Sequence, residues 1–113
     1  MPHLRIRALS DSAVKSLSVS LPSELAKILN TAEDNFTIEK VATTFYRQGD
    51  VLSEEQADPM VEFLWFDRGP EVRDRAAKKV TDMVRPLCRS EFIAVVFYDL
   101  PKESYYENGN SFK

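Results

Sequence analysis

The sequence predicts an α/β (α+β) fold in which two βαβ repeats form a four-stranded sheet with two helices on one face. Three observations support this prediction. Apolar and polar residues alternate over Pro2–Ala8, which is the period of a strand with one buried face. Apolar residues then recur at helical spacing over about 11–29. The same order of segments returns from Pro59 onward: Pro2 to Phe36 spans 34 positions and Pro59 to Phe92 spans 33.

The first repeat is predicted to contain a strand, a helix and a second strand. Either Ser10 or Asp11 is expected to cap the helix, because a side-chain oxygen there accepts a bond from an unpaired backbone N–H. Pro22 removes one backbone donor inside the helix, so we expect a kink or a break into two pieces. The segment Asn35–Tyr46 is rich in β-branched and aromatic residues and predicts the second strand. The apolar positions of the helix are Val14, Leu17, Leu21, Leu25 and Ile28.

The second repeat is predicted to follow a polar connector, Arg47–Asp58. Its strands are Met60–Phe66 and Glu91–Leu100, and Pro70 fits the first turn of the helix between them. A chain of 113 residues is below one typical domain unit, so we expect a single domain over 1–113. Repeat one then occupies about 2–46, the connector 47–58, repeat two about 59–100 and a C-terminal hairpin 101–113. The second helix carries its apolar residues at Val72, Ala76, Val80, Met83 and Leu87.

The charge balance and the hydropathy pattern exclude two kinds of partner. With 15 Lys and Arg against 18 Asp and Glu, the net charge of −3 provides no broad basic surface for a phosphate backbone. Nucleic acid is therefore not an expected partner, and an RNA-binding sheet of similar βαβ plan is disfavoured. No apolar run approaches the roughly 20 residues that cross a bilayer, and the N-terminus lacks the basic-then-apolar layout expected of a secretion signal. We expect no membrane partner and a cytoplasmic protein.

The content of cysteine and histidine limits redox and metal chemistry. Cys88 is the only cysteine and cannot form an internal disulfide, and it is expected to be a small buried residue. His3 is the only histidine, so no Cys/His zinc cluster can be assembled and no metal site is expected.

The sheet face that the helices leave uncovered is expected to be polar in part. Arg5 and Arg7 share one face of the first strand, and Glu39 and Glu62 are their predicted cross-strand partners. Scattered solvated charges are the alternative. The two strands of the second repeat also carry more apolar bulk than one small core requires, so self-association is expected to cover part of it. The aromatic residues concerned are Phe63, Trp65, Phe97 and Tyr98.

Met1-Pro2 is a candidate catalytic feature. Removal of Met1 would leave a proline whose nitrogen is a free secondary amine. An α-amino group titrates near about 7.7 to 8.0, and partial burial lowers that pKa toward the range where a general base works at neutral pH. The dipeptide by itself is also common without any such role.

Several segments resemble the tautomerase superfamily, which includes 4-oxalocrotonate tautomerase and macrophage migration inhibitory factor. The repeated plan begins at the proline itself, and the end of the chain, FYDL followed by YYENGNSF, looks like the last strand and C-terminal hairpin of the macrophage factor. The segments PHLRIRALS, NFTIEK, VEFLWFDRG and YYENG look closest to an uncharacterised bacterial branch. The resemblance covers essentially the whole chain.

The resemblance implies a homotrimer with three sheets around a central channel and a site near each N-terminal proline. Pro2 would act as general base and then acid on a small keto or unsaturated carboxylic acid, without metal or organic cofactor. The alternative is a non-catalytic trimeric binding or structural protein that kept the scaffold. Ala32 and Thr37 favour this alternative, because members of the superfamily commonly carry a basic residue there. Ala94 and Val96 likewise replace the tyrosine and asparagine of the macrophage factor.

Four further residues are candidates for binding the substrate. Arg68, in the turn before the second helix, could hold a carboxylate through two parallel hydrogen bonds; the alternatives are a solvated loop residue or a partner of Asp67. Tyr105, Tyr106 and Asn108 could form a pocket wall against a neighbouring subunit. Equally, their hairpin could only lock the trimer, with Asn108-Gly109 as a type I′ turn. Trp65 is expected to serve core or interface packing, and His3 no catalytic role.

Overall fold

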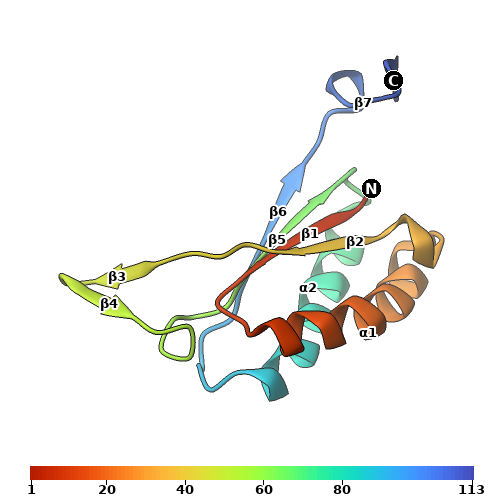
Figure 1. Cartoon of the computed structure of the whole chain (residues 1–113). Helices are drawn as coiled ribbons and strands as arrows, with labels where there is room; N and C mark the ends of the chain where they lie inside the picture. The colour runs from red at the N-terminus through yellow and green to blue at the C-terminus, as the bar shows by residue number, and fades with distance from the viewer.

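The structure, a computed structural model, describes residues 1–113 and contains the predicted sheet with two helices on one face (Figure 1). The strand order is β2-β1-β5-β6, in which β1 pairs with β2 and β5 with β6 in parallel, while β1 and β5 are antiparallel. The elements are β1 (His3–Arg7), α1 (Asp11–Leu29), β2 (Thr37–Lys40), β5 (Met60–Trp65), α2 (Pro70–Val84) and β6 (Ala94–Asp99). The two predicted βαβ repeats and the α+β class are confirmed.

The core lies between the sheet and the two helices. Leu4 and Ile6 of β1 are fully buried, as the alternating pattern predicted. Their cross-strand partners on β5, Phe63 and Val61, are also fully buried, because directly opposed residues share one sheet face. The helices close this layer with Leu17, Leu21, Leu25, Leu29, Ala76, Val80 and Val84.

Helix α1 begins at its predicted cap but does not break at Pro22. The Ser10 hydroxyl accepts a hydrogen bond from the Ala13 N–H at 3.1 Å, which makes Ser10 the cap. The helix then continues from Asp11 to Leu29, so of the two predicted outcomes, a kink or a break into two pieces, the break is wrong. Pro22 is itself buried and Leu21 and Leu25 beside it are fully buried, so the core contacts on either side of the missing donor hold one helix together.

The second strand is shorter than predicted. Residues 33–35 form a 3-10 turn, η1 (Glu33–Asn35), and β2 covers only Thr37–Lys40. Its partner β1 ends at Arg7 and the chain turns there, since Ala8 has φ +66°, so residues beyond Val41 have no strand to pair with. The chain pairs with itself instead, as β3 (Phe45–Arg47) and β4 (Asp50–Leu52). Part of the predicted strand and part of the predicted connector therefore form a separate hairpin.

The other element ends differ from the prediction by a few residues. Helix α2 starts with Pro70 after Gly69, as predicted, but ends at Val84 and continues as η2 (Arg85–Leu87). Pro86 explains the early end, because proline has no N–H for an α-helical bond. Strand β5 stops at Trp65 rather than Phe66, and β6 covers only the central part of the predicted Glu91–Leu100.

The C-terminal segment forms the predicted hairpin. After η3 (Lys102–Ser104), β7 (Tyr106–Glu107) pairs with β8 (Asn110–Ser111). Asn108 and Gly109 connect them with φ of 52° and 81°, the positive values at both positions that a type I′ turn needs. The expected turn at Asn108-Gly109 is confirmed.

The proline that begins each repeat makes the equivalent backbone hydrogen bond. The Pro2 carbonyl accepts a hydrogen bond from the Thr37 N–H at 3.3 Å, and the Pro59 carbonyl accepts one from the Ala94 N–H at 3.0 Å. Because β1 and β5 run antiparallel, the prolines lie at opposite ends of the sheet. We call these the Pro2 end, where β1 begins and β5 and β6 finish, and the Pro59 end, where β5 begins and β1 finishes.

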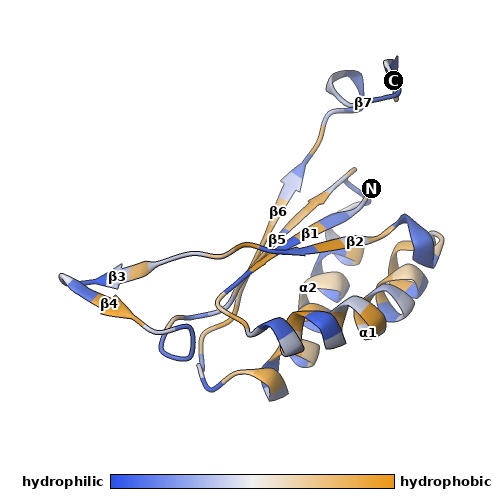
Figure 2. Cartoon of the chain, in the orientation of Figure 1, coloured by the Kyte–Doolittle hydropathy of each residue, from blue (hydrophilic) through white to orange (hydrophobic).

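Two hairpins project from this body (Figure 1). The hairpin β3–β4 extends beyond the Pro59 end of the sheet, and its Tyr46 and Val51 are 69% and 60% exposed. Apolar colour marks β4 in Figure 2, although no other part of the chain covers it. The radius of gyration, 14.9 Å, accordingly exceeds the value of about 13 Å expected for a compact chain of this length. Neither helix is long and apolar enough to cross a membrane.

Candidate functional site

Pro2 lies at the end of the sheet where β5 finishes. Its side chain is fully buried, on the same sheet face as Leu4. Register pairs His3 with Leu64, so one further step places Pro2 opposite Trp65. Strand pairing therefore brings the candidate base beside the indole at the end of β5.

Trp65 is held by packing on one side and by a hydrogen bond on the other. Its side chain is 0% exposed and its ring centroid lies 5.8 Å from that of Phe63 and 4.9 Å from that of Phe97. The indole Nε1–H donates to Asp99 Oδ1 at 2.7 Å. The predicted packing role is confirmed. The hydrogen bond to Asp99 fixes the orientation of the indole.

Arg68 lies over this indole. Its Cζ atom is 5.9 Å from the centroid of the Trp65 ring, within the range of a cation–π contact, and its Nη1 donates to the Phe66 carbonyl at 2.8 Å. Arg68 has no acidic partner: Asp67 instead accepts from the Gly69 N–H at 2.8 Å and lies 4.0 Å from Arg73. The alternative pairing of Arg68 with Asp67 is therefore wrong. Partial burial lowers the pKa of the Arg68 guanidinium from its ordinary value.

Tyr105 packs against its own chain at this end. Its ring lies 5.2 Å from Phe66 and 5.0 Å from Phe112, so the C-terminal hairpin is anchored to the turn that carries Arg68. The Tyr105 hydroxyl donates to Glu107 Oε2 at 2.8 Å, and this bond raises the pKa of the phenol. Tyr105 is thus engaged before any partner or ligand is bound.

Tyr106 and Asn108 do not join Pro2 and Arg68 within one chain. Tyr106 is 60% exposed, and Asn108 occupies the exposed turn of the hairpin. Lys102 is a cation that sequence reasoning missed: its Nζ lies 5.6 Å from the Phe66 ring and has no acidic partner. No local pattern signals it, because the contact depends on how the chain folds back after β6.

The uncovered sheet face carries a network of charged side chains. His3 Nε2 lies 2.8 Å and Arg5 Nε 3.3 Å from Glu39 Oε1, and Arg7 pairs with Glu62, as the cross-strand pairing predicted. The bond from His3 holds the pKa of Glu39 below its ordinary value. His3 also contacts Thr37 Oγ1 at 2.5 Å, so both ring nitrogens are engaged.

The aromatic surplus of strands β5 and β6 is mostly internal. Phe63, Trp65 and Phe97 pack together beneath the helices, with Phe63 and Phe97 stacked at 4.7 Å. Of the four residues expected to promote self-association, only Tyr98 lies on the uncovered face, where it is 45% exposed. The contribution expected from the other three was wrong, because their odd positions face the helices.

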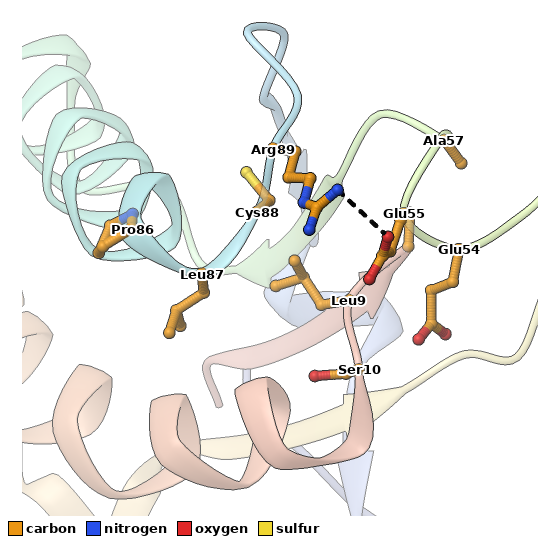
Figure 3. A pocket seen from close by; sticks show the side chains of 10 residues that line it. Leu9, Ser10, Glu54, Glu55, Ala57, Pro86, Leu87, Cys88 and Arg89 are labelled. Carbon is orange, nitrogen blue, oxygen red and sulfur yellow. Dashed lines mark ion pairs between the residues drawn. The ribbon is translucent and has the colours of Figure 1, made fainter.

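One pocket lies at the Pro59 end, away from Pro2. It has a volume of about 300 Å³ and is closed on one side by Arg89, which reaches Glu55 at 3.8 Å (Figure 3). Half-buried Cys88 lies on its wall. Neither this pocket nor two others of about 440 and 380 Å³ are lined by Pro2, Arg68 or Tyr105. No three His, Cys, Asp or Glu side chains are placed to hold a metal ion. The pocket is lined by residues 8–10, 54, 55, 57 and 86–89.

Two solved bacterial structures resemble the whole chain. Residues 1–111 match the family described as "Domain of unknown function (DUF1904)". The crystal structure of such a domain from Sebaldella termitidis is 33% identical over 98% of this chain and 99% of its own, with a TM-score of 0.89. A protein of unknown function from Vibrio cholerae is 37% identical over 97% of this chain and 86% of its own, with a TM-score of 0.83. No curated protein matches the chain.

More distant structures share the fold. A macrophage migration inhibitory factor homologue from Prochlorococcus marinus is 17% identical over 99% of this chain and 98% of its own, with a TM-score of 0.74. A fused 4-OT described as a wild-type asymmetric trimer is 12% identical over 97% of this chain and 95% of its own, with a TM-score of 0.81. The expected tautomerase-like fold is confirmed.

Proposed function

We propose that this chain, which belongs to the DUF1904 family, is a cofactor-independent tautomerase that uses Pro2 as general base on a small keto or unsaturated carboxylic acid. The proposed unit is the whole chain, 1–113, acting as one domain, because the C-terminal hairpin packs on Phe66 next to the site. The observation that carries the proposal is the approach of Pro2 and Arg68 to one indole. Pro2 is opposite Trp65 by register, and Arg68 lies on the ring.

The electrostatics at this end suit an amine base. Arg68 has no acidic partner, so its charge is available to a substrate carboxylate. The same positive charge disfavours a second cation nearby, and a buried amine is disfavoured as a cation as well. Both effects lower the pKa of a free Pro2 nitrogen, which then accepts protons at neutral pH.

The reaction needs a chain that begins at Pro2, because the nitrogen is a tertiary amide while Met1 is attached. The free amine takes a proton from the substrate hydroxyl of an enol, and the resulting ammonium returns a proton to carbon to give the ketone. Arg68 binds the substrate carboxylate and orients the enol against Pro2. The proton shift involves no net oxidation or reduction, so the step needs no redox cofactor.

The proposed assembly is a homotrimer in which a neighbour completes the site. No well-formed pocket surrounds Pro2 in the single chain, and the projecting hairpins expose apolar side chains such as Tyr46 and Val51. The 4-OT structure of the same fold is described as a trimer. Tyr106 and Asn108 are then available to a neighbouring site. Sedimentation should give three times the subunit mass at micromolar concentration; a single-subunit mass would contradict the trimer.

A non-catalytic trimeric binding protein is the second candidate. The lack of a well-formed pocket around Pro2 favours it, as do Ala32 and Thr37, neither of which provides a cation. In the structure Thr37 is bonded to His3, which is consistent with a structural role. The two candidates differ in a single requirement: only the enzyme depends on the amine of Pro2.

Ketonisation of phenylpyruvate tests the proposal. Mass spectrometry first confirms that Met1 is absent from the purified protein. Pro2→Ala should then lower kcat/KM about 10²- to 10⁴-fold, the range of a general base. Pro59→Ala is the matched control, because Pro59 is equally buried and has the same place in the second repeat. Equal rates for wild type and Pro2→Ala, or equal losses in both variants, would exclude Pro2 as the base.

A further inference from the structure

Arg68 is placed by contacts on two sides that leave part of its guanidinium free. The Trp65 ring lies beneath it, and the Phe66 carbonyl accepts a hydrogen bond from its Nη1. Neither Nη2 nor Nε makes a hydrogen bond or ion pair, and these two nitrogens form an edge that matches the two oxygens of a carboxylate. The position of this edge depends on the plane of the indole.

The plane of the indole depends in turn on Asp99. Register places Trp65 beside Asp99 on β6, and the Nε1–H donates to its carboxylate at 2.7 Å. The rest of the ring is held by Phe63 and Phe97, whose contacts are apolar and less directional than a hydrogen bond. Asp99 is exposed, so it is not required to fill the core.

We infer that Asp99 is a positioning residue, which acts through the Trp65 indole to hold the free edge of Arg68 where a substrate carboxylate binds. This inference rests on the proposed function, since it concerns the same site. It adds a specific chain of contacts. Asp99 fixes the orientation of the indole, the indole fixes the position of the Arg68 guanidinium, and the guanidinium binds the substrate carboxylate. Asp99 and Trp65 do not contact the substrate.

The single tryptophan makes the inference measurable without catalysis. Trp65 is the only tryptophan in the chain, so emission excited at long wavelength reports on this ring alone. The probe is 3-phenylpropanoate, which has a carboxylate but no keto or enol group to isomerise. Its amide, 3-phenylpropanamide, has the same shape without the charge. The carboxylate should change the emission in a saturable way and the amide should bind more weakly.

Two substitutions at one position separate positioning from bulk stability. Asp99→Leu removes the acceptor and should raise the Kd of 3-phenylpropanoate about tenfold, the usual scale for misaligning one charged hydrogen bond. Asp99→Asn retains an oxygen that accepts from the indole, and its Kd should stay within about twofold of wild type. Asp82→Leu, on the exposed side of α2, is the control and should leave the Kd unchanged.

The kinetic constants should change in the same way as the Kd of the probe. In Asp99→Leu the KM for phenylpyruvate should rise while kcat changes little, because binding of the substrate carboxylate is weakened but the proton transfer is not. A Kd for Asp99→Leu equal to wild type, in a protein shown to be folded by its urea midpoint, would overturn the inference. An equal rise in Asp99→Asn would also overturn it, since charge rather than the indole bond would then be responsible.

Failure of the proposed function has a different signature. If Pro2 is not the base, Pro2→Ala ketonises phenylpyruvate at the wild-type rate, whatever the probe does. If only the positioning inference is wrong, Pro2→Ala still loses activity, and the two Asp99 variants bind the probe equally, either like wild type or with the same rise in Kd.

Discussion

The two ends of the sheet are built by the same repeat but differ in the residues that come after each strand. Strand β5 starts after Pro59 and finishes at the Pro2 end, where Trp65 is the sixth residue after Pro59 and the following turn carries Arg68. Strand β1 starts after Pro2 and finishes at the Pro59 end, where Ala8 is the sixth residue after Pro2 and the following turn carries buried Leu9. The first end is filled by a large ring with a cation over it. The second end keeps a hollow of about 300 Å³.

The difference between these ends shows that a hollow by itself does not make the better candidate site. At the Pro59 end two cations have acidic partners. Arg89 lies 3.8 Å from Glu55, and Lys40 lies 3.1 Å from Glu54. At the Pro2 end Arg68 and Lys102 lie over aromatic rings without an acidic partner. An unpaired, half-buried cation favours an anionic ligand, whereas a matched surface pair does not.

The largest expected effect comes from removing the large side chain that fills the Pro2 end. Trp65→Ala should lower the free energy of unfolding by about 3–5 kcal/mol, the usual cost of removing a fully buried aromatic side chain. Leu87→Ala, at the edge of the hollow, should cost less than about 1 kcal/mol because Leu87 is already 37% exposed. Urea denaturation measures both. Similar losses for the two variants would remove the contrast in packing between the ends.

The contrast in charge predicts a smaller, functional effect. Arg68→Gln should lower kcat/KM for phenylpyruvate by about 10- to 100-fold, the value of a charged hydrogen bond to a carboxylate. Arg89→Gln removes a cation of the same kind from the Pro59 end and should leave the rate unchanged. Steady-state kinetics with both variants test this. If Arg89→Gln is as slow as Arg68→Gln, the hollow takes part in the reaction.

The smallest effect concerns the C-terminal hairpin, which packs on Phe66 at the Pro2 end. The bond to Glu107 raises the folded-state pKa of Tyr105, so its contribution to stability is complete below the unfolded pKa of about 10 and is lost as pH rises through the folded value. Above pH 10 the hairpin should therefore loosen slightly. Alkaline titration of tyrosine absorbance shows this, and Tyr105→Phe should abolish the effect. A folded pKa for Tyr105 at or below that of a model phenol would contradict it.

The repeats and the core can be predicted from the sequence because they depend on local periodicity. Leu4 and Ile6 alternate with polar neighbours, and Leu17, Leu21 and Leu25 recur on one helix face, so their burial needs no knowledge of the rest of the chain. The cap at Ser10 and the turn at Asn108-Gly109 are likewise local. Resemblance predicts the tautomerase-like fold, which periodicity alone does not distinguish from other βαβ folds.

The features that sequence reasoning missed depend on how segments distant along the chain are paired. Thr37–Lys40 ends where β1 ends, and nothing between Val41 and Tyr46 signals that the strand has lost its partner. The bond from Trp65 to Asp99 depends on a register between strands 34 residues apart. The pairing of β5 with β1 and β6 likewise turns Phe63, Trp65 and Phe97 toward the helices rather than toward the uncovered face.

The nitrogen of Pro2 provides the most direct test. In protein labelled with ¹⁵N-proline and lacking Met1, the Pro2 resonance should titrate with a pKa below the ordinary α-amino value of about 7.7. Arg68→Gln should raise that pKa, because it removes a neighbouring positive charge. A Pro2 nitrogen that titrates at or above its ordinary value, or that does not respond to Arg68→Gln, would contradict an amine base placed beside that guanidinium.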